Sequence, residues 1–275
     1  MKANVVNFHI TDKCNFRCSY CFARFGQRDL PLEDAKRVID SVGEYFMVNG
    51  ISDGRINIAG GEPFVYKHLS EIIGYIKSKG IGVSVITNGL LVNTDMRDTL
   101  AQLDMLGISI DAASDSCNKC IGRSCGSVTQ DFEALGEVAD LLHEMGVKVK
   151  VNTVVSRLNL DEDLTPIYNR LRPDKIKLVC VHSVENINGD DVRDLVPSEE
   201  EYRDFVRRNT VEGIKTVIEE SGYMQNSYLM INPQGEVFMN ERGVERKFGS
   251  CLEAPLYKIY ETLPIDEEKF FLRYT

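Results

Sequence analysis

Short apolar runs with strand character alternate with amphipathic helical segments along most of this 275-residue chain. This alternation constrains the fold more than any other feature, because parallel strands need crossover connections that helices usually supply. The runs that read as strands are 4–10, 55–61, 82–89, 107–113, 147–155 and 174–182. The segments that read as helices are 32–50, 66–80, 93–106, 129–146, 159–172 and 198–221. The pattern predicts an α/β fold, a partly open (βα)6 barrel with its site at the carboxyl ends of the strands.

The last part of the chain departs from this alternation. The stretch "NSYLMINPQGEVFMN" (226–240) reads as a hairpin that turns at Pro233–Gly235, and a short helical tail follows. We see no linker, repeat or low-complexity segment. We therefore expect a single structural domain, with a partial barrel over 1–222 and a C-terminal extension over 223–275 that closes the site.

Composition narrows the class of protein. The net charge is −10 and the sequence pI is near 5.0, which argues against non-specific binding to nucleic acid or membranes. A few inward-facing cations can still hold an anionic small molecule. The sequence has neither an apolar run of membrane-spanning length nor a signal peptide, so we expect a cytoplasmic protein without membrane or nucleic-acid partners. Its eight cysteines then indicate metal or redox chemistry.

Three cysteines follow the first predicted strand closely, in "TDKCNFRCSYCF" (11–22). Cubane iron–sulfur clusters take four ligands, usually thiolates. Cys14, Cys18 and Cys21 can hold three irons and leave the fourth open for a cofactor or substrate, as catalytic zinc sites keep one open position. The alternative is a zinc site with His9 as fourth ligand, which the C-x3-C-x2-C spacing fits poorly.

The cysteine spacing, with Tyr20 before the last cysteine, resembles the signature of radical S-adenosylmethionine (radical SAM) enzymes. "GGEP" (60–63) after the second strand, "TNG" (87–89) and "SID" (109–111) fall where that superfamily has its supporting motifs. The resemblance implies a [4Fe-4S] cluster on the three cysteines, with S-adenosyl-L-methionine on its open iron. The residues that it assigns to the cofactor are Tyr20, Phe22, Gly60, Gly61, Glu62, Asn88, Ser109, Arg123 and Asn152.

Over most of its length the chain also resembles the viperin family, in particular its prokaryotic members. The stretches are "CNFRCSYCF", "LPLEDAKR", "INIAGGEPF", "IGRSCG", "KVNTVVSRLNLDEDL" and "NSYLMINPQGEV". Two features depart from the family: Arg55 stands where viperins commonly have Lys, and "CNKC" (117–120) is not a family hallmark.

Membership implies a reaction on a ribonucleoside triphosphate such as CTP, UTP or GTP. A 5′-deoxyadenosyl radical takes the ribose 4′-hydrogen, and the 3′-hydroxyl leaves as water after an electron and a proton arrive. The 3′-deoxy-3′,4′-didehydro product terminates viral RNA synthesis, so the resemblance implies a lyase in antiviral defence. It also implies an external electron donor such as flavodoxin or ferredoxin.

The strands offer separate support for a triphosphate. In "VKVKVNTVV", Lys150 and Asn152 share one strand face, which we expect to point into the barrel because the valines face the helices. An inward ammonium favours an anionic ligand. Lys177 on the next strand supports the same argument, whereas Lys148 and Lys175 read as solvated strand starts. The predicted triphosphate ligands are Arg55, Arg123, Lys150 and Lys177, with the cofactor carboxylate as the alternative partner of Arg123.

Three further residues are substrate candidates. Tyr228 matches a tyrosine of the family's C-terminal segment and would cap the substrate or donate a proton or hydrogen atom; packing in a hairpin is the alternative. Asn7 and His9 alternate on the first strand toward the cysteines and would reach ribose or base, although a single strand histidine is more often structural.

A second trio, Cys117, Cys120 and Cys125, fits metal binding loosely, with Cys180 or Cys251 as fourth ligand. We expect no second cluster, because the trio surrounds the "IGR" that should contact ligand; disulfide-prone or free thiols are the alternative. The alternative functions are a radical SAM GTP cyclase, a peptide-modifying enzyme and a non-enzymatic iron–sulfur protein. The first two usually have cysteine motifs near the C-terminus, where this chain has only Cys251 beyond residue 180.

Overall fold

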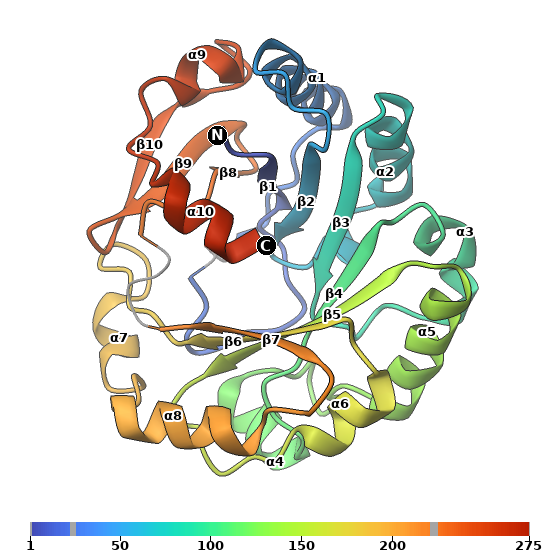
Figure 1. Ribbon diagram of the computed structural model, residues 1–275, viewed down its shortest axis with the longest axis vertical. Helices are drawn as coiled ribbons and strands as arrows, with labels where there is room; N and C mark the ends of the chain where they lie inside the picture. The colour runs from blue at the N-terminus through green and yellow to red at the C-terminus, as the bar shows by residue number, and fades with distance from the viewer. Residues whose placement is uncertain (1, 23–25, 221–224, 275) are drawn as a thin grey trace.

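Parallel strands and outer helices form the main body of the computed structural model, which describes residues 2–22, 26–220 and 225–274 (Figure 1). The strands form one sheet with the order β10-β9-β8-β1-β2-β3-β4-β5-β6-β7. The strands are β1 (Val5–Thr11), β2 (Arg55–Gly60), β3 (Gly82–Thr87), β4 (Met105–Ser109), β5 (Lys148–Val155), β6 (Lys175–Cys180), β7 (Lys215–Glu219), β8 (Met230–Ile231), β9 (Glu236–Glu241) and β10 (Val244–Ser250).

Most helices connect successive strands and lie outside the curved sheet, and the last two follow β10 (Figure 1). They are α1 (Leu32–Val48), α2 (Leu69–Ser78), α3 (Arg97–Leu100), α4 (Asp115–Ile121), α5 (Phe132–Glu144), α6 (Thr165–Leu171), α7 (Gly189–Arg193), α8 (Glu199–Arg208), α9 (Leu256–Tyr260) and α10 (Glu267–Tyr274), with 3-10 turns at Pro63–Val65 and Thr94–Met96. Neighbouring strands from β1 to β7 pair in parallel, which confirms the predicted partial (βα)6 barrel.

The predicted helix over 198–221 is wrong in its second half. Helix α8 begins with a capping box at Ser198 and ends at Arg208, and residues 215–219 form β7 beside β6. "KTVIE" has the β-branched residues typical of a strand, and Gly213, with a φ of 82°, turns the chain between the two elements.

The predicted helix over 93–106 is also too long. Helix α3 ends at Leu100, and β4 begins at Met105. Sequence reasoning missed three further elements: α4, α7 and β10.

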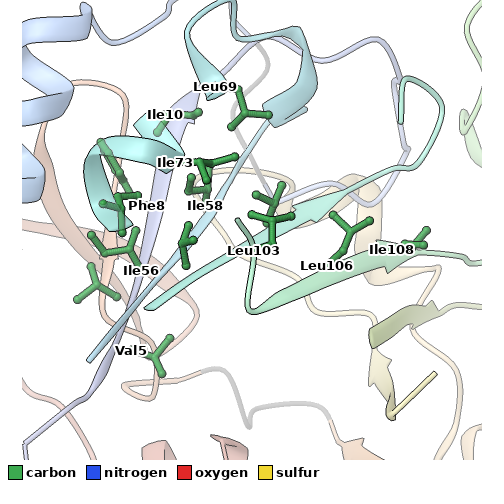
Figure 2. Packing of buried hydrophobic residues seen from close by; sticks show 14 of the residues in the cluster. Val5, Phe8, Ile10, Ile56, Ile58, Leu69, Ile73, Leu103, Leu106 and Ile108 are labelled. Carbon is green, nitrogen blue, oxygen red and sulfur yellow. The ribbon is translucent and has the colours of Figure 1, made fainter. Parts of the chain in front are cut away.

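Alternating burial fixes which way the barrel strands face. Along β5, every second residue from Val149 to Val155 is buried, whereas Lys150, Asn152 and Val154 face the barrel interior. The buried faces of β1, β2 and β4 pack Phe8, Ile58 and Leu106 into the layer under α2 (Figure 2). The strands therefore turn their apolar side to the helices and leave polar side chains for the interior.

The C-terminal extension continues the barrel sheet. Strand β8 pairs in parallel with β1, with Asn7 opposite Met230, and β9 and β10 follow as antiparallel neighbours. This pairing confirms the expected hairpin over 226–240 and brings Tyr228, just before β8, to the interior pocket. Within the described residues, we find no helix that is long and apolar enough to cross a membrane.

Candidate active site

Two glycines let the cysteine loop pack against its neighbours. The N–H of Gly61 donates to Thr11 O, and a Cβ on Gly61 would lie 2.0 Å from Lys13 O. On the other side, Arg17 N donates to Gly122 O at 2.9 Å, and a Cβ on Gly122 would lie 2.1 Å from Arg17 O. The loop that carries the three cysteines is thus held between the GGEP turn and the end of α4 by backbone contacts that only glycine permits.

Polar donors lie beside two of the three thiols. Asn88 Nδ2 is 3.9 Å from Cys14 Sγ, and Arg123 Nη1 is 3.9 Å from Cys18 Sγ. Burial raises the pKa of the Cys18 thiol to about 11, while the Arg123 guanidinium opposes this rise. A metal ion would favour the thiolate, and these donors would then stabilise its charge.

Arg123 is part of a buried ionic network. Its Nη1 lies 2.8 Å from Asp111 Oδ2, and the two side chains are 4% and 1% exposed. Asp111 also accepts hydrogen bonds from the Tyr20 hydroxyl and from Val154 N, both at 2.7 Å. The network joins the cysteine loop to the ends of β4 and β5.

Glu62 of the GGEP motif is wholly buried and has protein partners. Its carboxylate accepts hydrogen bonds from Phe64 N, the Thr87 hydroxyl and Asn88 N. These contacts tie the GGEP turn to the end of β3, and they aim the Asn88 amide at Asn15 and Cys14. The sequence predicted that Glu62 contacts the cofactor. That contact stays a prediction, in addition to the hydrogen bonds by which Glu62 joins the GGEP turn to β3.

A pocket beside Cys18 and Cys21 collects many of the predicted cofactor residues. It is lined by Cys18, Tyr20, Cys21, Phe22, Ser109, Asp111, Arg123, Asn152 and His182, with apolar residues of β5, β6 and the segment after β6. Arg123 Nε is buried and has no hydrogen-bond partner among the described residues. A carboxylate would complement this N–H, so the lining fits an amino-acid cofactor.

A second pocket fills the barrel interior. It is lined by Asn7, His9, Phe22, Asn57, Ala59, Ile86, Ser109, Lys150, Asn152, Val154, Lys177, Val179, Tyr228 and Met230. Its cavity volume is about 230 Å³, and its lining combines apolar side chains with a few polar ones, as ligand pockets commonly do. Ser109 and Asn152 line this pocket and the cofactor pocket, so a ligand in one would lie beside a ligand in the other.

Cations gather where the interior pocket reaches the amino ends of the strands. Asn57, Ile86 and Lys150 are shared with a third pocket that is lined also by Arg55, Met105, Lys148, Val149, Asp174, Lys175 and Lys215. Within the described residues, the side chains of Arg55 and Lys150 make no ion pair. Burial and the neighbouring cations hold the pKa of Lys150 well below its ordinary value.

The third interior cation, Lys177, has close partners. Its Nζ forms an ion pair with Glu219 and donates a hydrogen bond to the Tyr228 hydroxyl at 2.6 Å. Tyr228 precedes β8, so the pairing of the extension with β1 brings this side chain into the interior pocket.

The two first-strand candidates lie in the same pocket. Asn7 accepts a hydrogen bond from Asn57 Nδ2 at 2.7 Å and donates to Leu229 O. His9 packs edge-to-face on Phe238, and burial lowers its pKa to about 4, so the imidazole is neutral at pH 7.

Comparisons with known proteins identify the family to which the chain belongs. The model of the radical SAM superfamily matches residues 8–171. A protein of Flammeovirga pacifica, named S-adenosylmethionine-dependent nucleotide dehydratase, is 31% identical over 98% of this chain and 93% of its own length. One of the same name from a Thermoplasmatales archaeon (strain ISO4-H5) is 32% identical over 99% of this chain and 95% of its own length.

The chain belongs to the radical SAM superfamily. Within it, the similar proteins assign the chain to the viperin family, as its motifs predicted. Among solved structures, Streptococcus suis SuiB bound to its precursor peptide SuiA superposes with a TM-score of 0.71. The identity is 15%, and the match covers 98% of this chain and 66% of SuiB, so it supports the fold alone.

This radical SAM enzyme therefore uses a [4Fe-4S] cluster and S-adenosylmethionine. Among the described residues, no three His, Cys, Asp or Glu side chains are close enough to hold one metal ion. A cubane does not need that arrangement, because each thiolate binds a different iron. Cys14, Cys18 and Cys21, all partly exposed, are the residues that would hold the cluster.

Sequence reasoning missed several residues of this radical SAM site. Asp111 closes the "SID" motif and Lys175 begins β6, but neither was assigned to a ligand site. Glu219 fell inside the wrongly extended helix. Lys175 is partly buried rather than out in solvent, and burial first, then the neighbouring cations, lowers its pKa. A polar residue at a barrel strand end was the available signal for Asp111 and Lys175.

The second cysteine trio lies at α4 and the loop after it. Cys117 is partly buried and its thiol lies 3.3 Å from Leu158 O, whereas Cys120 and Cys125 are exposed. Arg123, between them in sequence, turns to the cofactor pocket. The expectation that the trio holds no second cluster stays a prediction.

Proposed function

We propose that this viperin-family protein converts a ribonucleoside triphosphate (CTP, UTP or GTP) to its 3′-deoxy-3′,4′-didehydro analogue. The product would terminate viral RNA synthesis, and the protein would act in antiviral defence. The names of its relatives support a nucleotide substrate, and the residues of the interior pocket support the triphosphate.

The cation cluster is the observation that carries the proposal. Arg55, Lys150, Lys175 and Lys177 come from three strands and meet in or beside one pocket of a protein whose net charge is −10. The cost of holding buried ammonium groups together without anions is high. A triphosphate, with several negative charges in a short chain, would offset that cost.

The pocket geometry suggests how the nucleotide lies. Its phosphates would contact Arg55, Lys150 and Lys177 near the amino ends of the strands, with Lys175 as a further partner. Its ribose would then lie nearer the carboxyl ends, between Asn7, His9 and Tyr228. Arg123 is absent from the linings of both lysine pockets, so we assign it to the cofactor carboxylate with Ser109 and Asn152.

When bound and reduced, the cluster and S-adenosylmethionine supply the 5′-deoxyadenosyl radical that removes the ribose 4′-hydrogen. The protein's task is to orient that hydrogen and to exclude water. The C3′–O bond then breaks, and an electron and a proton release the hydroxyl as water. Tyr228, whose hydroxyl lines the pocket, is our candidate for the proton.

The test is an anaerobic assay of the reconstituted protein. Dithionite, S-adenosylmethionine and one of CTP, UTP, GTP or ATP are supplied, and the nucleotides are analysed by mass spectrometry. We expect a triphosphate lighter by one water, formed together with 5′-deoxyadenosine. 5′-Deoxyadenosine with every nucleotide unaltered would refute the substrate, and the absence of 5′-deoxyadenosine would refute the enzyme.

Two variants separate the parts of this proposal. Cys18→Ala should lose the cluster and both products. Cys120→Ala is the matched control, because it removes an exposed thiol outside the proposed cluster loop. It should keep both products.

A further inference from the structure

A buried carboxylate lies among the cations of the interior pocket. Glu219, the last residue of β7, is 2% exposed and forms an ion pair with Lys177, whose side chain is 8% exposed. The Tyr228 hydroxyl lies 3.4 Å from the second carboxylate oxygen of Glu219. A negative charge here would repel a triphosphate, so its burial in this place needs a compensating role.

We propose that Glu219 is a positioning residue, the internal counter-ion that keeps the pocket lysines charged and Lys177 against Tyr228 until a phosphate takes its place. The inference rests on the proposed function for the identity of the ligand. The ion pair and its hydrogen bond to Tyr228 are properties of the chain itself.

The electrostatic setting favours this role. Lys150 and Lys177 share one pocket, and Lys175 and Arg55 lie close enough to lower the pKa of Lys150 further, whereas Glu219 raises it. Like charges that are crowded in a partly desolvated site tend to lose their protons. The nearby carboxylate opposes that loss before any phosphate arrives.

Among the described residues, one titratable neighbour of Glu219 is Tyr202, which stays neutral at neutral pH. Tyr202 on α8 donates its hydroxyl to the backbone oxygen of Glu219 at 3.1 Å, and burial raises its pKa. Cys180, at the end of β6, is buried near Tyr202. Besides Glu219 and the four cations, the charged groups of this region are Lys148, Asp174 and Lys215 of the neighbouring pocket and the exposed Glu220.

Phosphate binding would exchange one anion for another. Lys177 can turn from Glu219 to the phosphate and remain paired. Tyr228 then keeps Glu219 as a hydrogen-bond partner, which holds its hydroxyl in the pocket during the exchange.

The decisive variant is Glu219→Gln, which removes the charge and keeps the shape. Glu220→Gln is the matched control, since it makes the same change at the next, exposed residue. The affinity of the reconstituted, S-adenosylmethionine-loaded protein for CTP, UTP, GTP and inorganic tripolyphosphate is measured by calorimetry between about pH 6 and pH 10.

We expect Glu219→Gln to bind at least as tightly as the wild type at the acid end, because the pocket becomes more positive. Its affinity should fall earlier as the pH rises, with the alkaline limb displaced downward by about one pH unit or more. Glu220→Gln should follow the wild type throughout. If the alkaline limb of the affinity profile does not move, or if the affinity falls equally at every pH, the counter-ion role of Glu219 is refuted.

A second measurement needs no ligand. Glu219→Gln leaves Lys177 without its carboxylate, so the melting temperature at neutral pH should fall; adding Lys177→Met should restore most of it, because the uncompensated charge is gone. No restoration refutes the inference even if nucleotides bind. Conversely, a wild type that binds none of the probes refutes the proposed function while the melting result still decides the role of Glu219.

Discussion

Replacement of Asp111 by Asn should destabilise the protein strongly, because it leaves Arg123 buried without its carboxylate. The two side chains are 4% and 1% exposed and lie 2.8 Å apart, so water cannot take the place of the lost charge. Removing one partner of such a pair costs about 3–5 kcal/mol. Asn keeps one oxygen, so one of the two donors, Val154 N at Oδ1 or the Tyr20 hydroxyl at Oδ2, also loses its acceptor.

Anaerobic urea unfolding of the cluster-free protein measures this loss without interference from iron. Glu199→Gln is the control, because Glu199 pairs with Arg203 where both side chains are 70% exposed. It should cost less than about 1 kcal/mol. The double variant Asp111→Leu with Arg123→Met removes both charges and should be more stable than Asp111→Asn. A loss below about 1 kcal/mol for Asp111→Asn would refute the reasoning, since it would mean that the pair is solvated.

Three further outcomes follow from the site. Lys150→Met should weaken triphosphate binding at least about tenfold, because a cation of the pocket is lost, while the iron content stays unchanged. Calorimetry measures the affinity and iron analysis measures the cluster. An unaltered affinity would place Lys150 outside the phosphate site. Cluster assembly on the apoprotein should accelerate as the pH rises from about 7 to 9, since the pKa of Cys18 is raised to about 11 and the thiolate fraction grows about tenfold per unit; a flat absorbance rate would contradict this. Gly61→Ala should prevent stable cluster binding, because its Cβ would lie 2.0 Å from the backbone oxygen of Lys13. Gly74→Ala in α2 is the control for general folding, because its Cβ would make only an ordinary contact, 3.5 Å from Gln102 Oε1. Equal iron in both variants would refute the packing argument.

Local patterns in the sequence were enough to orient the barrel strands. Alternation along "VKVKVNTVV" predicted that Lys150 and Asn152 face inward, and both line the interior pocket. The rule works because a strand with one face against helices must put its apolar residues on that face. Local turn residues likewise predicted the hairpin of the extension, which the antiparallel pairing of β8 with β9 confirms.

Contacts between distant parts of the chain were out of reach of local patterns. Tyr20 and Asp111 are 91 positions apart, and no motif spacing links their hydroxyl–carboxylate bond. Helical continuity was assumed through 215–219, which hid β7 and with it Glu219. A charged residue at the end of an unrecognised edge strand gives no periodic signal of its own.

The two ends of the barrel strands carry opposite chemistry. At the carboxyl ends, the cysteine loop, the GGEP turn and the Arg123–Asp111 pair surround a pocket that suits an amino-acid cofactor. At the amino ends, Arg55 and Lys175 begin their strands and crowd toward Lys150. A radical formed at one end acts only over atomic contact, so a substrate anchored by its phosphates at the other must span the interior. On this reasoning the cations fix how far the ribose reaches, and the side chains between the two ends select which of its hydrogens is removed.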